Sequence, residues 1–189
     1  LDLNETINAA KSKPFGFAEF RPGPGVGGHC IPIDPLYLSW LAKKNNFDAK
    51  FIKLASEINI KTTKWCINQI NKNIKKFNLT KILLIGIAYK KNIEDTRESA
   101  GIKIFEYFKS KKMKIDYFDP YVKKHIFEIN KKKKNYFSIN KKFFKKYDAF
   151  IICADHDIID YNKLKNFNKV IFDIRGRYNK VKSDKIISI

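Results

Sequence analysis

The sequence predicts an α/β protein in which a helical segment is followed by a doubly wound parallel sheet. Before residue 80, apolar residues recur at helical spacing, whereas beyond it short apolar runs alternate with helical stretches. Residues 81–88 form an almost uninterrupted apolar run, as expected of a strand that is buried on both faces of a parallel sheet. These observations favour a helical region over residues 1–79 and a Rossmann-like domain over residues 80–189.

Three helices are expected in the first region. The first ends at Pro14, because proline cannot continue a helix. The second is predicted from Asp34, with Pro35 in its first turn, to Asn45. The third is longer and covers about residues 49–77.

The third helix carries two separate apolar stripes. One stripe comprises Phe51, Leu54, Ile58 and Trp65, and the other comprises Ile52, Ile60, Ile67, Ile70, Ile74 and Phe77. A surface helix needs only one stripe, so this helix is predicted to be buried on two sides. Either another segment of the same chain or a second copy of the chain would cover the second side.

After the first strand, three more strands alternate with three helices. The strands are predicted at residues 114–118, 149–153 and 169–173, and the helices at residues 102–111, around 143–147 and at 161–167. A basic, poorly patterned insertion over residues 122–137 interrupts this alternation.

The chain has a formal net charge of +20, from 39 basic and 19 acidic residues. Clustered lysine attracts phosphate whatever the sequence of a nucleic acid. Lysine is over-used along the whole chain, however, and no base-reading motif is present, so no specific nucleic-acid partner is expected. Only four basic residues are arginine (Arg21, Arg97, Arg175 and Arg177), and unless they are scattered surface residues their planar fork suits a phosphate or carboxylate.

Neither a membrane span nor a disulfide framework is indicated. No run of eighteen apolar residues occurs and the first residues do not resemble a signal peptide, which predicts a soluble, cytoplasmic protein without a membrane partner. The three cysteines, Cys30, Cys66 and Cys153, are far apart and odd in number, and their spacing suits neither disulfides nor a metal. Cys66 and Cys153 are expected in the core.

Residues 21–35 contain four of the eight glycines and four of the six prolines. Glycine permits positive φ and close approach of another group, while proline fixes φ. Together they predict a rigid loop whose backbone N–H groups are free to face a ligand. The loop ends at the thiol of Cys30 and the carboxylate of Asp34, so we interpret it as an active-site loop. The alternative is that Cys30 is an ordinary buried cysteine.

This loop resembles the GGxCxxxD loop of the UDP-glucose/GDP-mannose dehydrogenase family, the nucleotide-sugar 6-dehydrogenases. The resemblance reappears at residues 89–99, which are similar to a YKxxxxDTRES segment, and at residues 173–175. His29 and Ile33 stand where the branch acting on glucose usually has serine and lysine. The chain therefore looks most like the branch that oxidises UDP-N-acetylhexosamines.

The resemblance implies an NAD-dependent oxidation of the C6 alcohol of a nucleotide-sugar to the acid, in polysaccharide precursor biosynthesis. Cys30 would form a thiohemiacetal and then a thioester with the sugar, and Asp34 would orient the hydrolytic water. The substrate-binding positions would be Phe15, Phe17, Arg21, Gly23, Gly25, Gly27, Tyr89, Lys90 and Arg175. Lys90 and Arg175 are expected at neighbouring strand ends, where they would hold the charged part of the UDP-sugar. Arg97 would reach the NAD, and no metal is implied.

The resemblance also bears on the extent of the chain and its partners. The family's NAD-binding domain would precede this chain, which has no GxGxxG motif, so the chain is expected to be a C-terminal half. Its long helix would pair in a homodimer or higher oligomer. By itself, such a half could instead be a non-catalytic remnant that binds a UDP-sugar and dimerises.

Structural roles compete with functional ones at four residues. Glu98 and Ser99 could serve only to cap the next helix. Asp119 stands where a ribose-binding acid is expected, although an Asp-Pro turn explains it equally well. His29 is interpreted as structural unless its ring turns toward Cys30.

Overall fold

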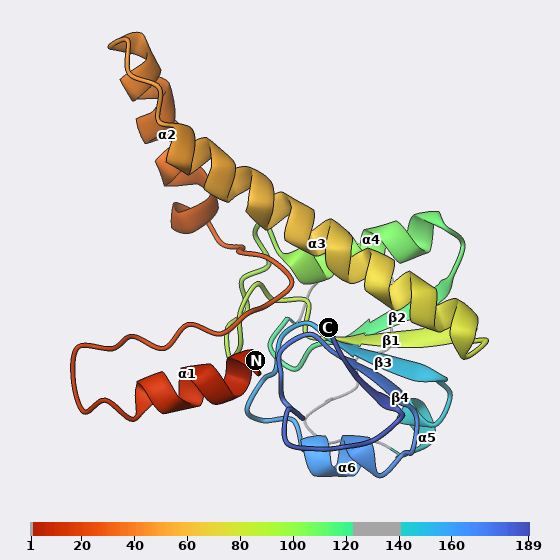
Figure 1. The fold of residues 1–189 in the computed structure, drawn as a ribbon. Coiled ribbons are helices and arrows are strands. Elements are labelled where there is room, and N and C mark those ends of the chain that lie inside the picture. Colours follow the sequence, from red (N-terminus) through yellow and green to blue (C-terminus); the bar gives the residue numbers. More distant parts are fainter. Residues whose placement is uncertain (1, 123–140) are drawn as a thin grey trace.

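The computed structural model describes residues 2–122 and 141–189, and it places a five-stranded parallel sheet at the centre of this part of the chain (Figure 1). The strands are β1 (Lys81–Ile85), β2 (Lys114–Phe118), β3 (Ala149–Ile152), β4 (Val170–Asp173) and β5 (Ile186–Ser188), in the order β2-β1-β3-β4-β5. The predicted α/β class with a parallel sheet is confirmed. The three residues of β5 were not predicted, because so short a run gives no pattern. The predicted basic insertion lies almost wholly outside the described residues.

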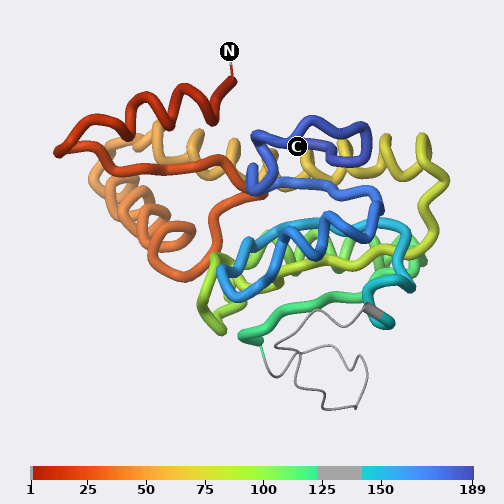
Figure 2. The backbone as a smooth tube through the Cα atoms, turned by 90° about the horizontal axis from the view of Figure 1, so that it is seen from below, coloured from red at the N-terminus to blue at the C-terminus, as the bar shows by residue number. Residues whose placement is uncertain are grey.

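Helices cover both faces of the sheet (Figures 1 and 2). On one face, α3 (Lys50–Lys76) and α4 (Ala100–Ser110) enclose one hydrophobic cluster. On the other, α5 (Lys141–Phe144) and α6 (Tyr161–Lys165) enclose a second cluster. Ile82 and Leu84 of β1 belong to the first cluster, while Leu83 and Ile85 belong to the second. Successive residues of a strand point to opposite faces, so a strand with both faces buried needs the unbroken apolar run that predicted it.

Several predicted bounds need small corrections. The last predicted helix ends at Lys165 rather than at residue 167, and α5 ends at Phe144, so Tyr147 follows the helix. At α4 the Oγ of Ser99 accepts hydrogen bonds from the N–H groups of Gly101 (3.1 Å) and Ile102 (3.4 Å). The helix-capping interpretation of Ser99 is therefore confirmed.

The helical region begins with α1 (Leu3–Lys11), whose N-cap Asp2 accepts two backbone hydrogen bonds. The next helix, α2, spans Cys30–Lys44 and so begins four residues earlier than predicted. Pro35 consequently lies beyond the first turn. Pro32 is the proline that fits the first turn. It is the third residue of the helix, and a backbone N–H at this position has no partner within the helix.

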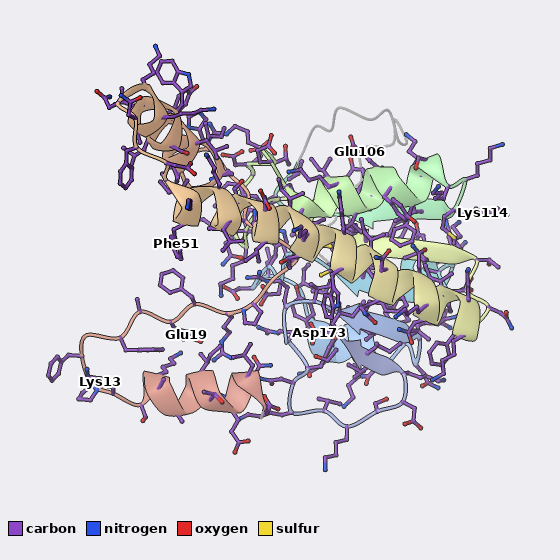
Figure 3. The ribbon with its side chains drawn as sticks, turned by 45° about the horizontal axis from the view of Figure 1, so that its top comes forward. Lys13, Glu19, Phe51, Glu106, Lys114 and Asp173 are labelled. Carbon is purple, nitrogen blue, oxygen red and sulfur yellow. The ribbon has the colours of Figure 1, made fainter. Side chains whose placement is uncertain are left out.

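The long helix was predicted to be buried on two sides, and the single chain covers only part of it. Ile67, Ile70 and Ile74 are buried against the sheet, but Ile60 of the same stripe is 54% exposed. All four residues of the other stripe are more than half exposed; Phe51 reaches 82%. Figures 1 and 2 show why: α1, α2 and the first half of α3 extend beyond the edge of the sheet, and Phe51 lies on this projecting part (Figure 3). Among the described residues, no helix combines the length and apolar character needed to cross a membrane.

Candidate active site

The glycine-proline loop is held at three points between α3 and the segment that follows β1. The Gly28 N–H donates to the carbonyl oxygen of Arg97 at 2.8 Å. On α3, the buried Thr63 hydroxyl donates to the Pro24 carbonyl at 2.6 Å, and the Asn59 side-chain oxygen accepts a loop N–H at 2.7 Å. The first bond joins the predicted active-site loop to the second predicted motif, which is more than sixty residues away in the sequence, and the other two join the loop to α3.

The glycines of this loop face the protein itself. A Cβ on Gly27 would lie 2.5 Å from the Tyr89 Cβ, and a Cβ on Gly23 would lie 2.1 Å from Nη1 of Arg175. At Gly25 the backbone has φ +143°, and a Cβ would meet a side chain of α3 at 2.7 Å. We expected the loop's N–H groups to be free for a ligand; at Val26 and Gly28 this is wrong, because both N–H groups donate to the protein itself. The glycines permit close packing between loop and motif, and substrate contacts at these positions stay a prediction.

Cys30 is the first residue of α2 and is exposed. The alternative of an ordinary buried cysteine is therefore excluded. One helical turn later, Asp34 lies on the same side, and the Cys30 sulfur, an Asp34 carboxylate oxygen and a His29 ring nitrogen all lie within 4.8 Å of one another. His29 Nδ1 is 3.9 Å from Asp34 Oδ1. The first N–H groups of a helix have no partner within the helix and favour a negative group, so this position suits a thiolate.

The same three side chains are a possible ligand set for a metal. Histidine nitrogen, cysteine sulfur and carboxylate oxygen are ligands that a soft divalent cation such as Zn²⁺ accepts. All three residues are exposed, and three ligands are one fewer than a closed tetrahedral site requires. This grouping was not anticipated from the sequence, where the cysteine spacing alone was considered.

The motif after β1 folds back on itself beside Cys30. The Tyr89 N–H donates to the Asp95 carbonyl at 3.0 Å. The Arg97 guanidinium binds the Asp95 carboxylate through Nε and Nη2, at distances of 2.6–3.1 Å. Asp95 raises the pKa of Arg97, mainly through these hydrogen bonds. The backbone of Arg97 also contacts the loop, because its carbonyl oxygen accepts the Gly28 N–H two residues before Cys30.

The predicted phosphate-binding residues Lys90 and Arg175 lie at the same edge of the sheet, but not at neighbouring strands. Lys90 follows β1 and Arg175 follows β4, and β3 runs between them. The expectation that these strand ends are adjacent is therefore wrong, because the strand order was not predicted. Lys90 is exposed, whereas Arg175 is half-buried with Nε 3.5 Å from Asp155 Oδ1.

The three predicted substrate residues Phe15, Phe17 and Arg21 lie on the segment between α1 and the first glycine of the loop. Phe15 is 76% and Phe17 is 41% exposed. Arg21 is engaged with its own region: its guanidinium donates to the side-chain oxygens of Asn4 (3.1 Å) and Asn8 (2.5 Å) and pairs with Glu19. Within the described chain, Arg21 thus ties the segment to α1.

Asp119 proves to be a structural residue. Its carboxylate accepts the N–H groups of Ile87 (2.8 Å) and Ala88 (3.0 Å) through one oxygen and those of Tyr121 and Val122 through the other. The ribose-binding alternative is therefore disfavoured, and the turn interpretation accounts for the residue.

Sequence reasoning missed the turn after β3, Asp155-His156-Asp157. Its residues contact Arg175, Asp119 and Asn92 respectively. Ligands bind at the carboxyl ends of parallel strands, so polar residues directly after the predicted third strand were a signal that could have found them.

The residues that the structure describes form no dinucleotide site of the glycine-fingerprint type. Gly86 follows β1 without the two further glycines of the fingerprint, and a Cβ there would lie 2.3 Å from the Ala154 carbonyl oxygen, so it serves strand packing. The N-terminus of α4 is capped by Ser99, and Asp119 at the end of β2 is occupied by backbone N–H groups. Arg97 is the one predicted cofactor contact that the chain offers.

The two remaining cysteines are core residues, as predicted. Cys66 of α3 and Cys153 after β3 are buried in the same cluster. Burial raises the pKa of the Cys66 thiol to about 11, and that of Cys153 is raised further in the same direction. At neutral pH both therefore remain unreactive thiols.

A doubly wound parallel sheet with basic residues at its carboxyl edge, beside a helix-terminal cysteine, defines a Rossmann-like α/β protein. Comparison with known families makes this specific. Residues 83–180 match the UDP binding domain of the UDP-glucose/GDP-mannose dehydrogenase family, and residues 1–61 match its central domain. The chain belongs to the UDP-glucose/GDP-mannose dehydrogenase family.

Individual relatives agree with this assignment. The chain is 34% identical over 167 residues to a UDP-N-acetyl-D-mannosamine dehydrogenase of Methanocaldococcus jannaschii, covering 88% of this chain and 34% of that protein. Among solved structures, it is similar to the UDP-D-ManNAc dehydrogenase from Pyrococcus horikoshii, with 26% identity and a TM-score of 0.70, over 98% of this chain and 42% of that one. The GDP-mannose dehydrogenase from Pseudomonas aeruginosa has the same fold, with 18% identity and a TM-score of 0.72, over 97% and 44% of the two chains. The chain thus spans between 34% and 44% of the length of these relatives.

Proposed function

We propose that the protein takes part in oxidising the C6 alcohol of a UDP-N-acetylhexosamine to the uronic acid, with NAD as hydride acceptor, in the supply of polysaccharide precursors. The observation that carries this proposal is the exposed Cys30 at the start of α2, with Asp34 one turn away and the basic strand ends nearby. The relatives named as UDP-N-acetyl-D-mannosamine dehydrogenases support an N-acetylhexosamine as the sugar.

Cys30 accounts for the second half of such an oxidation. Loss of one hydride and one proton from the alcohol leaves an aldehyde at C6. The Cys30 thiolate adds to that aldehyde, and the resulting thiohemiacetal loses a second hydride to become a thioester. Water then cleaves the thioester, releasing the carboxylate and the thiol. Asp34 is close enough to the sulfur to orient this water and to accept its proton.

The diphosphate of the substrate would lie across the carboxyl ends of β1, β3 and β4. Lys90 would approach it from one side and the Arg175 fork from the other, with β3 between them. Tyr89, against which the loop glycines pack, would contact the sugar nucleotide next to Cys30. On this proposal, residues 80–189 would hold the nucleotide and residues 1–79 would hold the reacting carbon.

NAD would be bound mainly by residues that this sequence does not include, because the chain offers no dinucleotide fingerprint. Arg97, whose carbonyl oxygen accepts the N–H of Gly28 in the loop that leads to Cys30, is the residue of this chain that would reach it. We further propose a cytoplasmic homodimer or higher oligomer that uses the exposed stripe of α3.

Calorimetric titration of the 189-residue chain tests the substrate part of this proposal. UDP-N-acetylglucosamine and UDP-N-acetylmannosamine should bind weakly, roughly at 0.1–1 mM, with affinity falling as salt rises because partly exposed charges are screened. NAD should not bind appreciably. Arg175→Lys should reduce UDP-sugar binding, because a single ammonium cannot replace the planar fork. NAD binding as tight as that of the UDP-sugars would refute the division of labour.

Cys30→Ser tests the chemistry in the protein that carries both this chain and an NAD site. The hydroxyl is a poor nucleophile, so acid formation should be lost, and His29→Ser is the matched control that alters the adjacent residue without removing the nucleophile. An undiminished yield of uronic acid from Cys30→Ser would refute the nucleophile role.

A non-catalytic UDP-sugar-binding and dimerising protein is the second candidate. The observation that favours it is the missing dinucleotide site of this chain. UDP-sugar binding without any acid formation by a preparation that also binds NAD would select it.

A further inference from the structure

Three consecutive side chains in the turn after β3 each hold a different part of the proposed substrate site. Asp155 lies 3.5 Å from Nε of Arg175, a nitrogen that has no hydrogen-bond partner among the described residues. Asp157 accepts from the Asn92 side chain at 2.6 Å, and its backbone N–H donates back to Asn92 Oδ1 at 2.9 Å. Since β3 runs between β1 and β4, this turn spans the gap between the two predicted phosphate-binding groups.

His156, between these aspartates, is completely buried and uses both ring nitrogens. Nδ1 accepts the backbone N–H of Asn92 at 2.9 Å, so this nitrogen carries no proton. The proton must then be on Nε2, which donates to Asp119 Oδ2 at 3.0 Å. The hydrogen bonds therefore fix one neutral tautomer of His156.

The Asp119 oxygen that receives this bond also accepts the N–H groups of Ile87 and Ala88. Burial alone would raise the pKa of Asp119, but the hydrogen bonds from His156 and the backbone outweigh it and lower that pKa, so the carboxylate stays charged. One continuous set of bonds thus runs from Ala88 through Asp119 and His156 to Asn92. It encloses the short segment that carries Tyr89 and Lys90.

We propose that the Asp155-His156-Asp157 turn is a positioning unit for the substrate site. His156 and Asp157 fix both ends of the segment that carries Lys90, while Asp155 orients Arg175, so the two cations face the diphosphate at a preset separation. Ligand binding then does not have to order the segment that carries Lys90. The affinity for the ligand therefore rises in proportion to the fraction of molecules whose site is already in the binding-competent arrangement. This proposal rests on the proposed function, in which Lys90 and Arg175 bind the UDP moiety.

A purely structural role for His156 predicts something different. In that case its removal would lower stability as any buried substitution does, and the folded fraction would bind UDP normally. Leu164→Ala is the matched control, because Leu164 is fully buried in the cluster on the α5–α6 face and its truncation leaves a cavity away from the site.

The test compares the unaltered chain with His156→Leu, His156→Gln, Asp157→Ala and Leu164→Ala. UDP is titrated by calorimetry below each variant's unfolding temperature, and amide hydrogen exchange at Asn92 is followed by NMR. His156→Leu should weaken UDP binding roughly tenfold or more, if the competent fraction falls to a tenth, and should accelerate exchange at Asn92. His156→Gln, which keeps an amide donor for Asp119, should recover part of both effects.

Asp157→Ala guards against a failure of the buried variants to fold. Its side chain is 54% exposed, so the fold should tolerate the change while the Asn92 side chain loses its acceptor. UDP binding should weaken roughly threefold, and Leu164→Ala should change neither affinity nor Asn92 exchange despite a lower melting temperature.

Unchanged UDP affinity in His156→Leu and Asp157→Ala would overturn the positioning role while leaving the proposed function standing. Equal losses in Leu164→Ala would also overturn it, because general instability would then suffice. If the unaltered chain itself does not bind UDP, the proposed function falls, and this inference falls with it.

Discussion

Two glycine-to-alanine substitutions in the same loop should affect different properties: Gly27→Ala should lower the stability of the protein, and Gly23→Ala should weaken the binding of UDP-sugar. At Gly27 the added Cβ would lie 2.5 Å from the Tyr89 Cβ and 3.0 Å from the Glu98 carbonyl oxygen. Both atoms belong to, or adjoin, the backbone of the second motif and cannot easily yield. At Gly23 the added Cβ meets chiefly the guanidinium of Arg175, at 2.1 Å, and this end of a flexible side chain can move aside.

The magnitudes follow from these contacts. Overpacking at Gly27 should lower the free energy of unfolding by roughly 1–3 kcal/mol. Alanine also reduces the conformational entropy of the unfolded chain, which offsets about 0.4–1 kcal/mol of this loss. The net loss should lower the melting temperature by roughly 2–6 °C for a chain of this size. Gly23→Ala should leave the melting temperature nearly unchanged, because its overlap is relieved by a side-chain rotation. It should instead displace Arg175 and weaken UDP-sugar binding.

Thermal unfolding followed by circular dichroism, with a calorimetric UDP titration of each variant, measures both effects. Val26→Ala, at an exposed position of the same loop, is the control for any change in the segment. The reasoning fails if Gly23→Ala destabilises the protein as much as Gly27→Ala and binds UDP normally.

Three further predictions concern thiol reactivity, pH and assembly. With a thiol reagent at pH 8, the exposed Cys30 should react rapidly. Cys66, whose pKa is raised to about 11, and the buried Cys153 should react only after unfolding. Rapid reaction of all three thiols would contradict the fold. The pKa of Asp119 is lower in the folded state than in the unfolded state. The Asp119 carboxylate therefore stabilises the folded state fully at pH values above its unfolded pKa of about 3.9. This stabilisation is lost as the pH falls through the folded-state pKa. Asp119→Asn should therefore cost roughly 1–3 kcal/mol at pH 7 and less in acid, as chemical denaturation at several pH values would reveal. Light scattering should give at least a dimer for the chain and a monomer for Phe51→Glu; a monomeric unaltered chain would exclude the exposed stripe of α3 as an interface.

The sequence predicted those parts of the fold whose pattern is local. The apolar run at 82–85 had to be a strand buried on both faces, and β2 was predicted at its observed bounds. The start of α2 was misplaced because the helix begins inside the Gly/Pro stretch, where Pro32 gave the same signal as Pro35. Strand order could not be predicted, because it depends on pairing between residues far apart in the sequence. The supposed adjacency of Lys90 and Arg175 failed for this reason.

For the site, the sequence pointed to the candidate reactive groups but not to what supports them. Cys30 and Asp34 were recognisable because they close a stretch rich in glycine and proline that resembles the family's GGxCxxxD loop, and the structure brings the two side chains together. On our proposal, the turn after β3 positions Lys90 and Arg175. This turn matches no sequence motif, and it can reach both residues only because β3 lies between β1 and β4. That position has a mechanistic consequence. A diphosphate carries its charges on two linked phosphates, and cations separated by a strand can approach it from both ends, while adjacent cations would crowd one phosphate and repel each other. If Lys90 and Arg175 bind the UDP moiety as proposed, this strand order suits the edge to a diphosphate rather than to a single phosphate.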